Sequence, residues 1–279
     1  MAVKIVADST CDFTPHMAQQ LGVTIVPLHV IFGDVSYRDG IDITAEEFYE
    51  MLVKSRQLPT TSAPSVGDFQ EVYTRLLDEG HSIVSIHLSG KLSATVRMAQ
   101  AAADSLKQPG RIAVVDSQSV SLGIGFAIME AAAATRSGAS LEEARAAAES
   151  IPRRLHIQFM VDTLEYLRRG GRIGRARAYL GTLLKIKPIL AVRDGELYPV
   201  ERVRTRSQGV ERIIQAAVRH QNVKLAGVGH SSTPDEAELI RERLAMAFPH
   251  AQVLVARFTP VIGTHGGPGV VGIGVVEGS

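Results

Sequence analysis

One histidine near the end of the chain stands among four glycines, in the segment Thr259-Pro260-Val261-Ile262-Gly263-Thr264-His265-Gly266-Gly267-Pro268-Gly269. Glycine carries no side chain, so it leaves backbone N–H groups open to a small anion, and the imidazole adds a titratable group. Clusters of glycine and proline are more often plain turns than sites. We therefore expect a glycine-rich turn here and treat it as a candidate pocket for an anionic head group.

Hydroxyl-bearing loops follow several predicted strands in the first half of the chain. They are Asp8-Ser9-Thr10-Cys11-Asp12, Thr60-Thr61-Ser62, Ser89-Gly90-Lys91-Leu92-Ser93 and Asp116-Ser117-Gln118-Ser119. The simplest role of such residues is to cap the next helix, which needs one of them per helix. These loops hold more hydroxyls than capping needs, and in an open parallel sheet they meet where ligands bind.

Arginine is concentrated in one short segment, at Arg168, Arg169, Arg172, Arg175 and Arg177. One interpretation is a solvated helix end, where cations are favoured by the helix dipole. The other is that Arg172 and its neighbours face the entrance of the head-group pocket, where they contact a phosphoryl group or an acidic protein surface. We expect nearby Asp162 and Glu165 to form local ion pairs with these arginines.

Composition limits the possible classes of protein. The 279 residues predict about two domains, and 30 lysines and arginines against 29 acidic residues give a net charge of +1. Such a balance argues against broad electrostatic binding to nucleic acid or membranes. The single cysteine, Cys11, excludes an internal disulfide. The chain enters a strand pattern without a basic leader and apolar region, so we expect a cytoplasmic protein. Its apolar runs of about ten residues are too short to span a bilayer, so we expect no transmembrane segment.

Hydrophobic periodicity predicts strands that alternate with helices up to residue 152, and hence parallel βαβ units. The predicted strands are 3–7, 83–86 and 112–115, and the predicted helices are 46–54, 66–79, 94–106, 124–136 and 141–150. Ser140 and Glu143 form a potential capping box for the last helix.

The regular alternation of strands and helices ends after Pro152. The pattern predicts strands at 155–161, 186–192, 196–203, 224–228 and 253–257, and helices at 207–220 and 234–248. A terminal apolar run follows at 270–276. Asp194-Gly195 predicts a hairpin turn and hence a mixed sheet. We therefore predict an α/β protein with two domains. Residues 1–152 are expected to form a three-layer α/β/α domain with a parallel sheet, and residues 153–279 a two-layer α/β domain with a mixed sheet.

Five segments, in order along the chain, resemble the motifs of the DegV family. They are Asp8-Ser9-Thr10-Cys11-Asp12, Thr61-Ser62-Ala63-Pro64-Ser65, Leu88-Ser89-Gly90-Lys91-Leu92-Ser93-Ala94-Thr95, Asp162-Thr163-Leu164-Glu165-Tyr166-Leu167-Arg168-Arg169-Gly170-Gly171-Arg172-Ile173 and Pro260-Val261-Ile262-Gly263-Thr264-His265-Gly266-Gly267-Pro268-Gly269. The resemblance extends over residues 4–276. Ala63, Gly90 and Ala94 depart from the usual pattern, and we expect them to change pocket shape rather than head-group binding.

The DegV family comprises bacterial fatty-acid-binding proteins, whose better-understood members are the acyl-carrying subunit of fatty acid kinase. The resemblance implies a long-chain fatty acid buried at the domain interface as the ligand. It implies carboxylate binding by Thr61, Ser62, Ser93, His265 and Gly266, and a kinase or phosphate contact at Arg172. It further implies an ATP-dependent kinase as the partner, no nucleic acid partner, and no cofactor, metal or catalytic residue of the chain's own.

Two alternatives stay open at this point. His265-Gly266-Gly267 is similar to the oxyanion turn of esterases, but the chain lacks the Gly-x-Ser-x-Gly elbow that should accompany it. A Ser/His hydrolase is therefore the weaker alternative. The other is a lipid shuttle, store or sensor that works without a kinase, which needs the same buried acyl chain. The nine histidines show no spacing typical of metal ligands.

Overall fold

The computed structural model describes residues 2–55, 57–180 and 186–278. Its first sheet has the order β2-β1-β6-β7, with β1 at Val3–Asp8, β2 at Val23–Val26, β6 at Ser82–His87 and β7 at Ile112–Asp116. All three strand pairings are parallel. The predicted parallel sheet is therefore confirmed, and the sequence pattern missed only its edge strand β2.

Helices cover both faces of this sheet. They are α3 (Val66–Asp78) and α4 (Thr95–Ser105) on one face, and α5 (Leu122–Arg136) and α6 (Leu141–Ser150) on the other. Successive side chains of β1 point to opposite faces of the sheet, so each face has an apolar surface for helices to cover. Val6 packs towards α3 and α4, whereas Ile5 and Ala7 pack towards α5 and α6. These are the three expected α/β/α layers. The predicted capping box of Ser140 and Glu143 is present.

The second sheet has six strands in the order β10-β9-β8-β13-β11-β12. Their bounds are β8 Leu155–Met160, β9 Lys187–Arg193, β10 Glu196–Val203, β11 Val223–His230, β12 Gln252–Arg257 and β13 Val271–Glu277. The β11–β12 pair is parallel and the others are antiparallel, so the sheet is mixed, as predicted. Asp194 and Gly195 connect β9 to β10 with positive φ angles of 49° and 75°.

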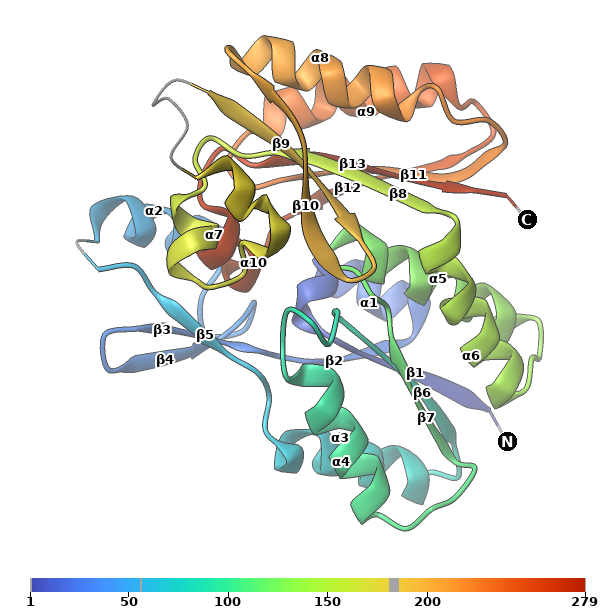
Figure 1. Ribbon diagram of the computed structural model, residues 1–279. Helices are drawn as coiled ribbons and strands as arrows, with labels where there is room; N and C mark the ends of the chain where they lie inside the picture. The colour runs from blue at the N-terminus through green and yellow to red at the C-terminus, as the bar shows by residue number, and fades with distance from the viewer. Residues whose placement is uncertain (1, 56, 181–185, 279) are drawn as a thin grey trace.

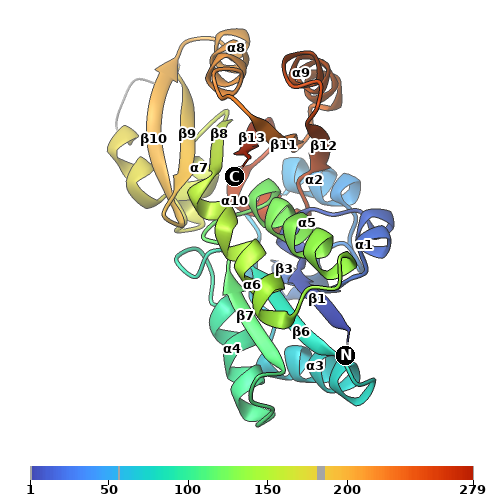
Figure 2. The same cartoon turned by 90° about the vertical axis from the view of Figure 1, so that its right-hand side faces the viewer.

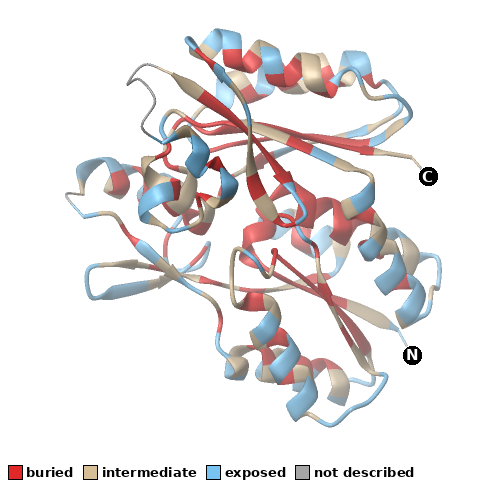
Figure 3. Ribbon diagram, in the orientation of Figure 1, coloured by how far each residue is buried: buried red, intermediate tan, exposed pale blue. Residues whose placement is uncertain are grey.

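Helix α5 lies between the two sheets (Figures 1 and 2). Ten of its fifteen residues are buried, and Figure 3 shows it buried along most of its length. Small residues on the second sheet allow this packing: a Cβ at Gly274 would lie 3.0 Å from the Phe126 ring, and one at Gly227 would lie 3.0 Å from Leu122. The outer face of the second sheet is covered by α8 (Arg206–Ala217) and α9 (Pro234–Ala247).

The remaining elements surround the ends of the two sheets. They are α1 (Pro15–Leu21), α2 (Ala45–Lys54), α7 (Glu165–Arg169), α10 (Pro260–Gly266), and a small antiparallel sheet of β3 (His29–Phe32), β4 (Val35–Arg38) and β5 (Thr60–Ser62). Three 3-10 turns lie at Ser9–Cys11, Ile151–Arg153 and Gly174–Tyr179. Of the helices and strands among these, the sequence pattern predicted α2 alone.

The expected glycine-rich turn at residues 259–269 is mostly a helix, α10, and that expectation was wrong. Pro260 occupies the first turn, where a missing N–H costs nothing. Gly263 makes the packing possible, since a Cβ there would lie 2.5 Å from Phe48 and 2.7 Å from the Tyr49 hydroxyl of α2. Tertiary packing against α2 and α7 thus favours a helix that local propensity does not predict.

The chain passes from α6 to β8 through the turn at Ile151–Arg153. The boundary between residues 152 and 153 stays a prediction. Within the described ranges, no helix is both long and apolar enough to cross a membrane.

Candidate ligand-binding site

A cavity of about 130 Å³ lies between the loops of the first sheet, α10 and the inner face of the second sheet. This volume is several times what one water molecule needs. Most of the wall is apolar and comes from Leu28, Leu88, Leu92, Val120, Leu122, Ile157, Phe159, Leu167, Val192, Leu197, Phe258, Val261, Ile262 and Val270. Both halves of the chain contribute to it, so the folded molecule as a whole forms the cavity.

The polar part of the wall consists of the residues that the sequence singled out. Thr61, Ser62, Ser93, Arg172, His265 and Gly266 all line this cavity, together with Ser121. They come from β5, the loop before α4, the segment after α7, and α10. The structure thus brings all six predicted residues to one cavity, while their roles as carboxylate or kinase contacts stay predictions.

The closest polar contact in the cavity joins two of these residues. The Thr61 Oγ1 and His265 Nε2 atoms lie 2.8 Å apart. Burial, and then the nearby Arg172 cation, lower the pKa of His265 from 6.5 to about 4. The imidazole is therefore neutral at pH 7, and its Nε2 either donates to Thr61 or accepts from it. When Nε2–H donates, the Thr61 hydroxyl proton is free to point towards a ligand.

The other face of the His265 ring lies against Gly170. A Cβ at Gly170 would lie 2.3 Å from His265 Nδ1, so only glycine fits beside the ring in this position. Nδ1 is buried and has no hydrogen-bond partner within the described part of the chain. A catalytic histidine of a hydrolase needs a carboxylate at this atom. The geometry therefore gives no support to a Ser/His hydrolase site at His265.

Ser93 combines two roles. Its Oγ lies 2.9 Å from Thr95 Oγ1 and accepts a hydrogen bond from the Thr95 N–H at 3.3 Å, at the start of α4. This is a local turn contact two residues along the chain rather than a cap, because Ala94 is the N-cap of α4 and no side chain caps the helix. Ser93 also lines the cavity. Ser62, which also lines the cavity, is more exposed and pairs with His29 of β3 in the small sheet.

The guanidinium group of Arg172 donates hydrogen bonds to two backbone carbonyls. Its Nε donates to the Leu92 carbonyl at 3.1 Å and its Nη1 to the Gly170 carbonyl at 2.8 Å. No carboxylate of residues 2–55, 57–180 or 186–278 forms an ion pair with it. Arg168 and Arg169 differ, because both pair with Glu165 as expected. Arg172 therefore carries a positive charge that no acidic side chain in the described part of the chain balances.

Asp162 does not form the expected ion pairs with this arginine segment, and that prediction was wrong. It contacts Lys187 Nζ at 2.7 Å and Arg206 Nη1 at 3.2 Å instead. Asp162 follows β8 by two residues and there meets Lys187 and Arg206, the first residues of β9 and α8.

A basic groove adjoins the cavity. It is lined by Lys91, Leu92, Gly171, Arg172, Gly174, Arg175, Arg177 and Glu196. Lys91 and Arg175 share the single carboxylate of Glu196, at 3.6 and 3.4 Å. Arg172 belongs to the walls of both the groove and the cavity. The polar end of the cavity thus borders a surface suited to anions.

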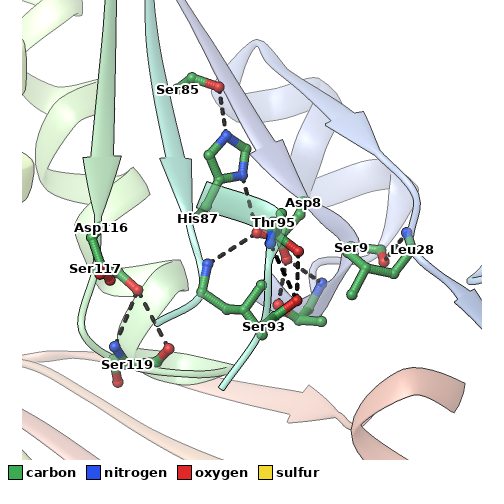
Figure 4. Close-up of polar contacts among 12 residues, drawn as sticks. Asp8, Ser9, Leu28, Ser85, His87, Ser93, Thr95, Asp116, Ser117 and Ser119 are labelled. Atoms are coloured by element: carbon green, nitrogen blue, oxygen red, sulfur yellow. Dashed lines mark hydrogen bonds and ion pairs between the residues drawn. The ribbon is translucent and has the colours of Figure 1, made fainter. Parts of the chain in front are cut away.

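A buried polar chain that the sequence did not predict lies below the loops. Figure 4 shows Ser85, His87 and Asp8 in a row. The Ser85 Oγ lies 2.7 Å from His87 Nε2, and His87 Nδ1 lies 3.1 Å from Asp8 Oδ2. The order resembles a catalytic triad. All three side chains are fully buried, and Ser85 also accepts a hydrogen bond from Tyr73, so the chain joins β1 to β6 and cannot reach a substrate.

Two buried carboxylates hold the start of α10. Asp12 Oδ1 accepts the Thr259 N–H at 2.8 Å, and Asp39 Oδ1 accepts the Val261 N–H at 3.3 Å. Burial raises the pKa of Asp12 to about 8 and that of Asp39 to about 6. Asp39 and Gly170 position His265 from distant parts of the chain, and no local sequence pattern marks them for this role.

Comparison with known proteins shows to which family the chain belongs. The model described as "Uncharacterised protein, DegV family" matches residues 2–278. The chain belongs to the DegV family. Protein DegV of Bacillus subtilis, for example, is 36% identical over 277 residues, which cover 98% of each chain. The resemblance found in the sequence motifs is therefore confirmed.

Two solved structures share the fold of this chain. A fatty-acid-binding DegV family protein from Thermus thermophilus superposes with a TM-score of 0.92 at 38% identity, covering 99% of this chain and 100% of that one. A stearic-acid-binding protein from Eubacterium ventriosum superposes with a TM-score of 0.91 at 28% identity, covering 99% and 98%. These two relatives are described as fatty-acid-binding proteins.

Proposed function

We propose that this DegV-family protein binds one long-chain fatty acid, with the tail in the apolar cavity and the carboxylate at the Thr61–His265 end. The observation that carries the proposal is the cavity itself, which is apolar along most of its wall and has hydroxyls, a neutral imidazole and a guanidinium at one end. The fatty acids bound by relatives with the same fold support the same ligand class.

The polar end provides what a desolvated carboxylate needs. The hydroxyls of Thr61, Ser62 and Ser93 are the proposed donors, with His265 orienting the first of them and Gly266 leaving room beside it. A hydrogen bond to a charged acceptor contributes about 1.5–3 kcal/mol before desolvation is subtracted. The acyl tail contributes ~0.8 kcal/mol per buried methylene, or on the order of 10 kcal/mol for a long chain before ordering costs.

The proposal extends to a partner, an ATP-dependent kinase that phosphorylates the bound carboxylate. In that step a carboxylate oxygen forms a bond to the γ-phosphorus of ATP, the bond to the ADP oxygen breaks, and the products are acyl phosphate and ADP. Arg172 is suited to this step, because it lines both the cavity and the basic groove and has no acidic partner among the described side chains. A guanidinium there would balance charge on the transferred phosphoryl group.

The first test is native mass spectrometry of the protein as purified from a bacterial host, followed by denaturing release of any small molecule. We expect one long-chain fatty acid per chain. A protein that is purified empty and takes up no added fatty acid would contradict the binding proposal. That outcome would favour an enzymatic site instead.

The second test addresses the kinase. Protein loaded with fatty acid is incubated with ATP and an ATP-dependent fatty acid kinase, and acyl phosphate is trapped by hydroxylamine as the hydroxamate. We expect product with the wild type, far less with Arg172→Ala, and wild-type amounts with Arg169→Ala, whose cation is paired with Glu165. Normal loading without any product would favour the shuttle or sensor over the kinase subunit.

A further inference from the structure

Three side chains with metal-ligating atoms meet on the second sheet, away from the fatty-acid cavity. His156 lies on β8, Glu277 is the last residue of β13, and His220 follows the end of α8. The His220 Nδ1 atom lies 2.9 Å from Glu277 Oε1, and the His156 Nε2 atom lies 3.6 Å from Glu277 Oε2. One ligand atom of each residue lies within 4.8 Å of those of the other two.

These separations fit one small cation. A tetrahedral ion with bonds of about 2.0–2.1 Å to nitrogen and oxygen holds its ligand atoms about 3.3 Å apart. Each histidine nitrogen lies near this distance from a different oxygen of Glu277, at 2.9 Å from Oε1 and 3.6 Å from Oε2. Imidazole lone pairs lie in the ring plane, so the two histidine rings must turn out of their present stack for both to reach one ion. The two imidazole rings are stacked, with centroids 4.0 Å apart and an angle of 22° between their planes.

The cluster lies on the opposite face of the sheet from the cavity. Side chains alternate along a strand, so His156 and Gln158 face α8 while Ile157 and Phe159 face the cavity. The side chains of His156, His220 and Glu277 are 44%, 26% and 39% exposed, so an ion from solvent can reach them. A small hollow of about 20 Å³, enough for one water, is lined by both histidines and by residues of α8.

The backbone beside the cluster is held in place by a neighbouring arginine. Arg154 fixes the backbone at Glu277, because its Nη1 donates to the Glu277 carbonyl at 3.0 Å.

We propose that His156, His220 and Glu277 form a binding site for a divalent transition-metal ion of the zinc type, separate from the fatty-acid site. Two imidazoles and one carboxylate suit Zn²⁺, whereas Mg²⁺ and Ca²⁺ prefer sites made of oxygen alone. Three protein ligands leave one position open to water. A bound ion would connect β8, β13 and the end of α8. No spacing in the sequence predicts this cluster, because its members are separated by 64 and 57 residues.

The test is calorimetric titration of ZnCl₂ into protein freed of metal with a chelator. We expect one Zn²⁺ per chain in the wild type, and binding weakened roughly tenfold or more in His156→Ala, His220→Ala and Glu277→Gln. Removal of a mere hydrogen-bond partner of a metal ligand already weakens metal sites about 10- to 100-fold. The matched control is His250→Ala, an exposed histidine on the turn after α9, which should bind Zn²⁺ like the wild type. MgCl₂ should give no binding.

A second measurement distinguishes loss of zinc binding from poor folding of a variant. Zn²⁺ should raise the Tm of the wild type and of His250→Ala more than that of His220→Ala, with the apo far-ultraviolet spectrum of each variant unchanged. Co²⁺ in place of Zn²⁺ should give the visible absorption of a nitrogen- and oxygen-ligated tetrahedral ion. The proposal is overturned if the wild type binds no Zn²⁺, or if His220→Ala and Glu277→Gln, correctly folded, bind it as well as the wild type.

Discussion

The hydroxyl of Thr61 is the group that the neutral His265 ring orients most directly. Thr61→Val keeps the shape of the side chain and removes the hydroxyl. If this hydroxyl binds the carboxylate, loss of about 1.5–3 kcal/mol should weaken fatty-acid binding about 10- to 100-fold. Displacement of a fluorescent fatty acid measures the change. Thr60→Val, at the exposed neighbour on the same strand, is the matched control, and equal affinity of both variants would refute the assignment.

Gly170 determines where the His265 ring can lie. Gly170→Ala places a methyl group 2.3 Å from the present position of Nδ1, so the ring must move and its contact with Thr61 is lost. We expect weaker fatty-acid retention by roughly tenfold, comparable to the loss of one hydrogen bond to a charged group. Gly67→Ala in α3 is the control, because a Cβ there has its nearest neighbour at 3.6 Å. Unchanged retention in Gly170→Ala would show that the ring position is unimportant.

The sequence predicted which residues line the cavity better than it predicted the contacts between them. Thr61, Ser93 and His265 stand in recognisable motifs, so their presence in one site follows from the family pattern. Gly170 and Asp39 act through neighbours 95 and 222 residues away, at His265 and Val261. Such contacts depend on how the chain folds back on itself, which local periodicity does not contain.

Among the elements, α10 is the one whose position matters most for the site, and buried carboxylates hold it. Between pH 3.8 and about 8, Asp12 keeps its proton in the folded chain but loses it in the unfolded chain. The folded state then binds more protons, so this group's contribution to the free energy of unfolding falls as pH rises. The slope for one such group is at most about 1.4 kcal/mol per pH unit.

We therefore expect Asp12→Asn to become more stable relative to the wild type as pH rises from 4 to 8. Urea unfolding at several pH values measures the difference between the two proteins. His265 acts in the opposite sense, because its lowered pKa makes the folded state lose stability as pH falls from 6.5 to about 4. This contribution is common to wild type and Asp12→Asn and cancels in the comparison. A difference that stays constant over this pH range would contradict the burial of a protonated Asp12.

Whether the sequence predicted a helix or strand depended largely on the length of that element. Long amphipathic helices such as α3 and α6 show clear periodicity and capping boxes, and both were predicted. Strands β3, β4 and β5 have three or four residues each, too few for a periodic signal. Helix α10 contains two glycines, and it forms because α2 and α7 pack around it.

For the whole molecule, the cavity links binding to stability, because both halves of the chain contribute to its wall. A ligand that binds only the folded state stabilises it by RT ln(1 + [L]/Kd), which is about 2.7 kcal/mol at 100 times Kd. For a protein of this size, such a gain raises Tm by about 5–10 °C. We expect this difference between protein loaded with fatty acid and protein stripped of lipid on a hydrophobic resin, measured by calorimetry. Loading His265→Ala under the same conditions should raise Tm less, whereas an equal rise would place the head group elsewhere.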